Sequence, residues 1–245
     1  MTSPDHPDGA PDRHGHATTE AAEHLVEHVR DVLHEVKPRL RGWLHAATAP
    51  LTLAAGVVLI ALSPNAATRI GSAIFAASAL VLFTVSAIYH RGTWSPRVWA
   101  FLRRFDHANI FLLIAGSYTP FTLLLLEGRD RTVLLTLVWV GAALGVLFRI
   151  FWTDAPRWLY VPIYVAVGWA AVFYFGDFVR NGGTAVVALI AVGGGLYTIG
   201  GIVYGVQRPN PSPAWFGFHE VFHTLTILAF FTHYIGVSIA TYSLR

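Results

Sequence analysis

Apolar stretches follow one another along the chain from about residue 46, each close to the roughly 20 residues that a bilayer requires. Short segments rich in Pro, Gly, Asn and Asp separate them. Only helices and closed barrels satisfy backbone polar groups in lipid, and these stretches are too long and too continuously apolar for barrel strands. The pattern therefore predicts an all-α membrane protein, a seven-transmembrane helix bundle with spans at about 46–63, 67–89, 107–126, 132–152, 158–178, 184–206 and 215–242.

The chain before these stretches has a different pattern. Residues 1–18 mix Pro, Asp, His and Gly without any apolar period, which is typical of a disordered polar tail, and no signal peptide is recognisable. In residues 19–42, apolar side chains recur at helical spacing between charged ones, which predicts an amphipathic helix at the membrane surface. The remaining residues, 43–245, form the predicted transmembrane domain. Solvated side chains are the favoured interpretation of the histidines in the first two segments: His6, His14, His16, His24, His28 and His34.

The composition supports a chain that faces lipid. Hydrophobic residues make up 54% of it and charged residues only 13%, whereas a soluble domain carries about 25% charged residues. The absence of cysteine excludes disulfides, iron–sulfur clusters and thiolate zinc sites. A net charge of only +3, with arginines scattered between apolar stretches, gives nucleic-acid binding little support.

The basic residues are distributed unevenly between the two sides of the predicted bundle. Most of the 17 Lys and Arg residues lie in the amino-terminal segment or in the second, fourth and sixth loops. The positive-inside rule then predicts a cytoplasmic amino terminus and an outside carboxyl terminus, in the bacterial inner membrane. Membrane lipids are the expected partners. The small-residue pairs Gly141…Gly145 and Gly201…Gly205 predict close helix packing within the bundle, with a homodimer contact as the alternative.

Few ionisable residues lie in the predicted spans, and most of them fall at the same side. His90 ends the second span, Asp106 and His107 open the third, and His219 and His223 open the seventh. Alternate spans run in opposite directions, so all these positions meet near the cytoplasmic side. Ionisable groups are costly in a membrane and mark functional sites by default.

Two of these histidines have the spacing of metal ligands on a helix. His219 and His223 are four residues apart, so both rings project from one helical face. A nitrogen from His90 would complete a three-histidine set and leave the fourth zinc position open for water. Neutral imidazoles without thiols suit zinc better than iron, copper or nickel. Asp106 and the hydroxyl of Ser86, one turn before His90, can reach a water or substrate at such a site.

Simpler interpretations exist for the individual residues. A single histidine at a helix end is usually interfacial, and this is the favoured interpretation of His107. Asp106 at a helix start would also be a favourable charge for the helix dipole. His233, deeper in the seventh span, is predicted to be a buried, hydrogen-bonded residue rather than a ligand.

Three motifs closely resemble those of the hemolysin III family, the bacterial branch of the progestin and adiponectin receptor (PAQR) family, within a superfamily that includes alkaline ceramidases. They fall in the same order, on the second, third and seventh spans. The motifs are Ser86-Ala-Ile-Tyr-His90, Phe105-Asp106-His107 leading into Leu113-Ile-Ala-Gly-Ser-Tyr-Thr-Pro120, and Phe218-His219-Glu220-Val221-Phe222-His223.

The resemblance implies a seven-helix bundle with a cytoplasmic amino terminus and a zinc ion near the cytoplasmic face. It places the zinc ligands on His90, His219 and His223, with Asp106 and Ser86 beside a water on the zinc. The chain departs from the family by lacking a Glu-x-x-Asn segment before the first span. Arg41-Gly-Trp-Leu-His45 takes its place, so His45 receives only a weak assignment to the site.

The letters His-Glu-Val-Phe-His also match the metalloprotease pattern in which the glutamate is the general base. An intramembrane protease of the site-2 type is therefore a competing family. The pattern lies in the last span, however, and no Leu-Asp-Gly motif follows it. Glu220 is accordingly interpreted as incidental to the chemistry.

Three hypotheses for function follow. The first is zinc-dependent hydrolysis of a lipid amide or ester, as in a ceramidase-like amidase, with Asp106 as proton acceptor and Ser86 as hydrogen-bond donor to the oxyanion. The second is a non-catalytic sensor or regulator of membrane state with structural zinc. The third is a pore-forming hemolysin, which the spans support poorly because they show no water-lined period and no ring of charges.

Overall fold

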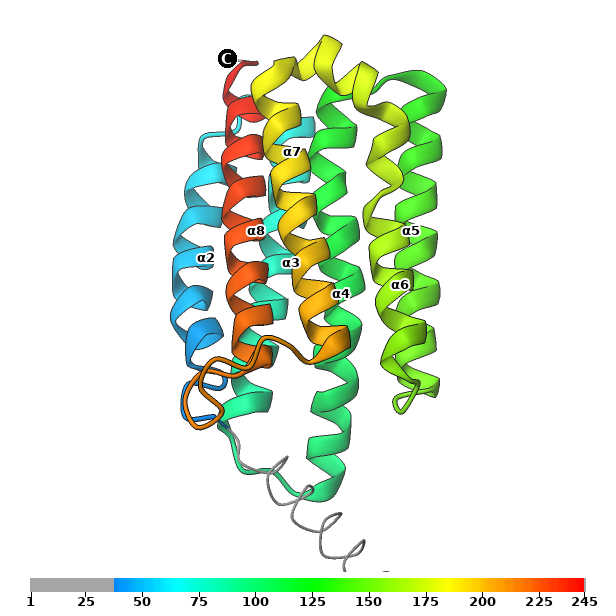
Figure 1. The fold of residues 1–245 in the computed structure, drawn as a ribbon. Helices are drawn as coiled ribbons and strands as arrows, with labels where there is room; N and C mark the ends of the chain where they lie inside the picture. Colours follow the sequence, from blue (N-terminus) through cyan, green and yellow to red (C-terminus); the bar gives the residue numbers. More distant parts are fainter. Residues whose placement is uncertain (1–37, 245) are drawn as a thin grey trace, which may run out of the picture. The chain divides into compact units, whose positions relative to one another are not determined.

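The computed structural model describes residues 38–244, and every regular element in this range is a helix. Figure 1 shows these helices packed lengthwise into a bundle. Their bounds are α2 Trp43–Ala61, α3 Ala66–Arg91, α4 Pro96–Leu125, α5 Gly128–Phe151, α6 Arg157–Gly168, the 3₁₀ helix η1 Ala170–Tyr174, α7 Phe175–Val206 and α8 Phe218–Tyr242.

Within the described residues, six helical segments are long and apolar enough to cross a membrane. Five of them are the single helices α2, α3, α4, α5 and α8. The sixth is the 50-residue stretch Arg157–Val206, which contains α6, η1 and α7. The all-helical membrane fold is therefore confirmed.

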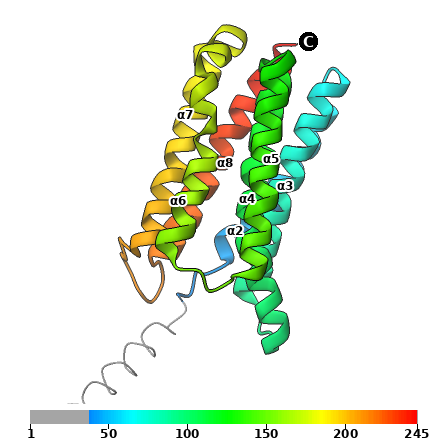
Figure 2. The same ribbon diagram turned by 90° about the vertical axis from the view of Figure 1, so that its right-hand side faces the viewer.

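The stretch from Arg157 to Val206 is interrupted twice. The first interruption is η1, and the second is Gly183, whose φ of 78° and ψ of 166° are not helical. Glycine adopts such a φ readily because it lacks a Cβ atom. Figures 1 and 2 show the chain reversing direction near this point, so that α6 and the later part of α7 run in opposite directions.

Close approaches at glycine hold the helices together. A Cβ atom on Gly145 of α5 would lie 2.3 Å from the ring of Phe111 in α4, so no larger residue fits there without a shift. Cβ atoms on Gly201 and Gly205 of α7 would lie 3.6 Å and 3.8 Å from Val161 of α6. All four glycines of the two pairs thus face a neighbouring helix of the bundle, and only at Gly145 is the approach too close for a larger residue.

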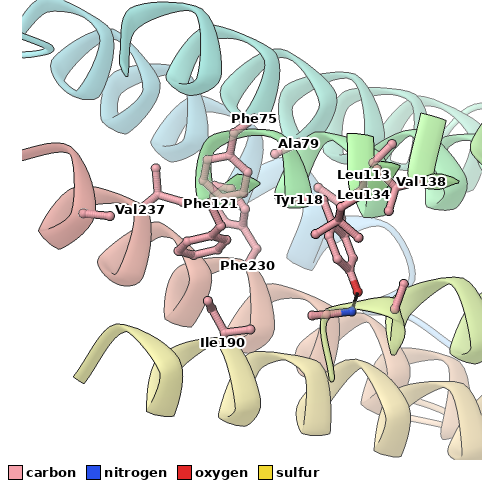
Figure 3. Packing of buried hydrophobic residues seen from close by; sticks show 14 of the residues in the cluster. Phe75, Ala79, Leu113, Tyr118, Phe121, Leu134, Val138, Ile190, Phe230 and Val237 are labelled. Atoms are coloured by element: carbon pink, nitrogen blue, oxygen red, sulfur yellow. Dashed lines mark hydrogen bonds between the residues drawn. The ribbon is translucent and has the colours of Figure 1, made fainter. Parts of the chain in front are cut away.

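The buried core joins α3, α4, α5, α7 and α8 through aromatic and aliphatic side chains, which Figure 3 shows at close range. Tyr118 of α4 is its main polar member. Its hydroxyl donates to the carbonyl oxygen of Gly168 at 2.6 Å and accepts from the amide of Ala171 at 2.8 Å. These bonds satisfy backbone groups that the break between α6 and η1 leaves free.

Four of the seven predicted spans agree with a helix to within a few residues, and the third, fifth and sixth differ. α6 ends at Gly168, ten residues before the predicted end of the fifth span, and α7 begins at Phe175, nine residues before the predicted start of the sixth. α4 begins at Pro96, eleven residues before the predicted start at 107, and proline at the first helical position explains the boundary. The predicted tail lies outside the described residues, and so does the predicted amphipathic helix up to residue 37. Residues 39–42 form turns that lead into α2.

Candidate functional site

Three histidines from two helices form a compact cluster. His90 lies in the last turn of α3, and His219 and His223 lie in the first turns of α8. One ligand atom from each residue lies within 4.8 Å of the others, and the Nε2 atoms of His90 and His219 are 3.3 Å apart. His90 and His223 are buried, and His219 is partly buried.

The fold brings these residues together because the end of α3 and the start of α8 lie at the same end of the bundle (Figure 1). The spacing of four residues places His219 and His223 on one face of α8, with ring centroids 4.5 Å apart. The His90 ring faces both, at 4.8 Å from His219 and 5.2 Å from His223. The predicted set of three histidines therefore converges.

The cluster offers three nitrogen donors that are close enough together to hold a metal ion. Two nitrogens on a tetrahedral zinc with bonds of about 2.0–2.1 Å are ~3.3 Å apart. The spacing between the Nε2 atoms of His90 and His219 matches this separation. Three imidazoles without a thiol are also a donor set that zinc accepts. The three histidines can thus hold a metal ion.

A carboxylate lies directly beside the cluster. Oδ2 of Asp106 is 3.6 Å from Nε2 of His90, and the Asp106 side chain is only 11% exposed. Asp106 is ten residues inside α4, so the alternative that it is a favourable charge at a helix start is wrong. Ser86, one turn before His90 on α3, is also buried.

A fourth histidine packs against the cluster from α2. His45 is 2% exposed, and its ring stacks on that of His223 with centroids 3.9 Å apart and planes 12° apart. Phe83 contacts the His45 ring edge-on at 5.0 Å. Neither ring nitrogen of His45 has a hydrogen-bond partner among the described residues. The weak sequence assignment of His45 missed this contact, because it depends on how α2 packs on α8.

Glu220 connects the start of α8 to the segment before α2. Its Oε2 accepts from the amide of Gly217 at 2.8 Å, and its Oε1 accepts from Nε of Arg41 at 2.8 Å. The Arg39 amide also donates to the carbonyl oxygen of Ala214 at 3.0 Å. Glu220 is fully buried, so its carboxylate serves helix capping and helix docking. This role agrees with its interpretation as incidental to the chemistry.

The structure also places two histidines outside the cluster, His107 and His233. His107 is partly buried, and its Nδ1 lies 2.7 Å from Nη2 of the buried Arg149 on α5, a partner that the sequence analysis did not predict. Its place at the membrane interface stays a prediction. His233 is buried with Nε2 3.3 Å from the carbonyl oxygen of Ile190, as predicted.

An apolar cavity of about 120 Å³ lies beside the cluster, between α4, α6, α7 and α8. Its walls include Leu113, Val161 and Ile190. Tyr204 and Phe222 also line it, and their ring centroids lie 5.6 Å and 6.1 Å from that of His219. The two aromatic rings thus separate the cavity from the histidine cluster.

Replacing a cluster histidine with alanine is expected to remove bound metal. Purified wild-type protein should contain about one zinc ion per chain. His219→Ala and His223→Ala should weaken zinc binding by more than the about 10- to 100-fold that loss of an outer contact causes. Metal content after dialysis measures this. His233→Ala, a buried histidine on the same helix, is the matched control and should keep its zinc; equal zinc in all variants would contradict the site.

The stack between His45 and His223 gives a second expectation. Nδ1 of His223 has no hydrogen-bond partner among the described residues, and of its aromatic-ring contacts the stack on His45 has the shortest centroid distance. His45→Ala should therefore weaken zinc binding by about 10- to 100-fold. His45→Phe keeps a flat ring and should lose much less. Competition with a chromogenic chelator measures both affinities, and equal losses would show that stacking has no role.

Comparisons with known proteins show to which family the chain belongs. The family model described as haemolysin-III related matches residues 33–234. The chain is 32% identical to the hemolysin-3 homolog of Bacillus subtilis (strain 168), over 65% of this chain and 76% of that protein. It is 29% identical to hemolysin-3 of Bacillus cereus, over 65% of this chain and 74% of that protein.

A more distant match is the progestin and adipoQ receptor-like protein 1 of Caenorhabditis elegans. It is 25% identical over 67% of this chain and 42% of that protein. The match of the family model over most of the transmembrane region, together with the two bacterial relatives, decides the family. This chain belongs to the haemolysin-III-related family of multi-pass membrane proteins, with similarity that extends to a progestin and adipoQ receptor-like protein.

Proposed function

We propose that this protein is a zinc-dependent hydrolase of a lipid amide or ester. The observation that carries the proposal is the cluster of three histidines with the largely buried carboxylate of Asp106 beside His90 and an apolar cavity behind the rings of Tyr204 and Phe222. Such a site combines a position for a metal, a group that can accept a proton, and space for a hydrocarbon chain.

His90, His219 and His223 would hold the zinc. A zinc ion with three protein ligands polarises a carbonyl group and lowers the pKa of a water that it binds toward about 7. The His45 ring would keep His223 in place, and the Arg41–Glu220 ion pair would keep the first turn of α8 in place.

Asp106 is the group placed to move a proton. Its Oδ2, at 3.6 Å from Nε2 of His90, would accept the proton of the attacking water and return it to the leaving amine or alcohol. The hydroxyl of Ser86 would donate a hydrogen bond to the oxygen on which negative charge develops. Both side chains are largely buried, so such bonds would form in a site with little competing water.

The cavity would bind the acyl chain of the substrate. Its lining is mainly aliphatic and aromatic, as expected for a site that takes hydrocarbon. Tyr204 and Phe222 line the cavity and also contact the ring of His219, so an acyl chain in the cavity would lie next to the cluster, and movement of these two rings would be needed for its carbonyl group to reach the metal. Membrane lipids are therefore the proposed substrates.

A second candidate function is a non-catalytic sensor of membrane state with structural zinc. The burial of His90 and His223, and the packing of α2 on α8 through His45, favour it. In this case the metal would fasten α3 to α8. Loss of zinc would then lower thermal stability, and no lipid would be hydrolysed.

For the topology, we propose seven spans with the amino terminus in the cytoplasm of a bacterial cell. Two observations support this count: Gly183 breaks α7, and the chain reverses there (Figure 2). The Arg157–Val206 stretch would then cross the bilayer twice. The excess of basic residues at the histidine end supports the orientation. A measurement of the molecular mass of the purified protein in detergent tests whether two copies form a homodimer.

Asp106→Asn should abolish hydrolysis while zinc remains bound. Loss of a general base lowers the rate by about 100- to 10,000-fold, whereas the three histidines are unchanged. The assay measures the release of fatty acid from ceramides, phospholipids and acyl esters by the purified protein, with and without a chelator. The matched control is Asp154→Asn, which removes the charge of an exposed carboxylate paired with Arg103 and should keep full activity.

The same assay distinguishes the two candidate functions. Chelator-sensitive release by the wild type supports the hydrolase. A zinc-loaded wild type that releases nothing from the whole panel, but melts at a lower temperature after chelation, favours the sensor.

Single cysteines can test the proposed topology, because the natural chain contains none. The three variants are Arg180→Cys, Ala214→Cys and Ser243→Cys. Arg180 lies close to the break at Gly183, Ala214 lies between α7 and α8, and Ser243 follows α8. In intact cells, a membrane-impermeant maleimide should label the variants substituted at Arg180 and at Ser243. The variant substituted at Ala214 should be labelled only after permeabilisation. Labelling of all three variants from one side would contradict two crossings between Arg157 and Val206.

A further inference from the structure

The short segment that leads into α2, residues 39–43, packs across the end of the bundle that carries the histidine cluster, and we call it the clasp. A Cβ atom on its Gly42 would lie 2.9 Å from Cβ of His90, so the clasp lies directly on the end of α3. The amide of Leu40 donates to the carbonyl oxygen of Trp215 at 3.3 Å. The clasp therefore joins the helix that carries His90 to the loop that leads into α8.

Two arginines of this region hold their guanidinium groups over tryptophan rings. The guanidinium carbon of Arg39 lies 4.6 Å from the ring centroid of Trp215, and that of Arg91 lies 3.8 Å from the ring centroid of Trp43. Contact with an aromatic face orients a guanidinium without using its N–H groups. Both arginines are exposed, so these N–H groups can donate to a molecule outside the chain.

Neither of these two arginines has an acidic partner among the described residues. Arg103 provides the contrast, because its guanidinium also lies over a tryptophan ring, that of Trp99, but pairs with Asp154 at 3.0 Å. The positive charges of Arg39 and Arg91 are therefore left without an ionic partner in this part of the chain.

Exposed tryptophans are concentrated at the same end of the bundle, where the chain enters α2, α4, α6 and α8 and leaves α3 and α5 (Figure 1). Six of the eight tryptophans of the chain lie there, each between 38% and 75% exposed: Trp43, Trp94, Trp99, Trp152, Trp158 and Trp215. Tryptophan is enriched at the level of lipid head groups in membrane proteins. The two unpaired arginines therefore lie where lipid phosphates are expected.

We propose that Arg39 and Arg91 bind phosphate groups of anionic membrane lipids, and that the bound lipid holds the clasp in place against the histidine cluster. Guanidinium groups form strong, charge-assisted hydrogen bonds with phosphate, and an anionic leaflet attracts basic residues near its surface. This binding goes beyond the proposed hydrolysis and needs no turnover.

The contacts of the clasp explain how lipid would affect the cluster. Arg91 belongs to α3, whereas Arg39 contacts Trp215 in the loop before α8. Lipid bound to both arginines would resist separation of the end of α3 from the start of α8. The same two helix ends carry the three histidines, so anionic lipid should slow the loss of a metal ion from them.

The first test measures the melting temperature of the purified full chain in vesicles of phosphatidylcholine and in vesicles of equal parts phosphatidylcholine and phosphatidylglycerol. Phosphatidylglycerol should raise it by several degrees, because a ligand that binds the folded state stabilises it. Arg39→Gln/Arg91→Gln should lose this increase. Inorganic phosphate added to phosphatidylcholine vesicles should not produce it, and a full increase from inorganic phosphate would overturn the assignment to a lipid.

The matched control is Arg97→Gln/Arg104→Gln, which removes two other exposed arginines at the same end and changes the net charge equally. It should keep the increase. An equal loss in both double variants would indicate a general attraction of the basic end to an anionic surface and would overturn the assignment to Arg39 and Arg91. If Arg39→Gln/Arg91→Gln does not fold, the two single variants replace it, and an undiminished increase in both would also overturn the assignment.

The second test measures how fast a chelator removes zinc from the protein in the same two kinds of vesicle. Phosphatidylglycerol should slow the loss of zinc several-fold for the wild type and leave it unchanged for Arg39→Gln/Arg91→Gln. Equal rates for the wild type in both vesicles would overturn the link between lipid and the cluster. The melting measurement needs neither zinc nor hydrolysis, so it decides the lipid site even where the proposed function fails.

Discussion

Lipid offers no hydrogen-bonding partner, so polar side chains buried in this bundle depend on one another. At the end where α3 finishes and α8 begins, buried polar groups are concentrated and α2 packs against them. The carboxylate of Glu220 joins the α8 cap to Arg41, and the ring of His45 lies flat on His223. The three-histidine cluster stands within this network. Its geometry therefore depends on helix packing as much as on the helix that carries two of its members.

α8 has a double role as a consequence. It provides His219 and His223 for the cluster, and it provides Glu220 between them for attachment of the chain before α2. One helical turn therefore carries both the candidate metal ligands and the docking residue. A change that loosens the docking would also shift the cluster, which links the stability of this end of the bundle to the ability to bind metal.

Two electrostatic situations exist side by side in the same region. At the cluster, three imidazoles and the carboxylate of Asp106 leave a position that suits a cation. At Arg149, a guanidinium is buried against the ring of Tyr160 and a ring nitrogen of His107. Because His107 follows Asp106 in α4, the two sites are adjacent in the chain.

Much of this arrangement follows from the sequence alone. Apolar length determines the spans, and the helical period places His219 and His223 on one face, because both depend only on neighbouring residues. The convergence of His90 was also predictable, since alternate spans end on the same side. The stack on His45, the Arg41–Glu220 pair and the position of Arg149 beside His107 were decided by tertiary structure. These contacts join residues as many as 179 positions apart, and the rotation and crossing of whole helices, which no local pattern encodes, determine which side chains meet.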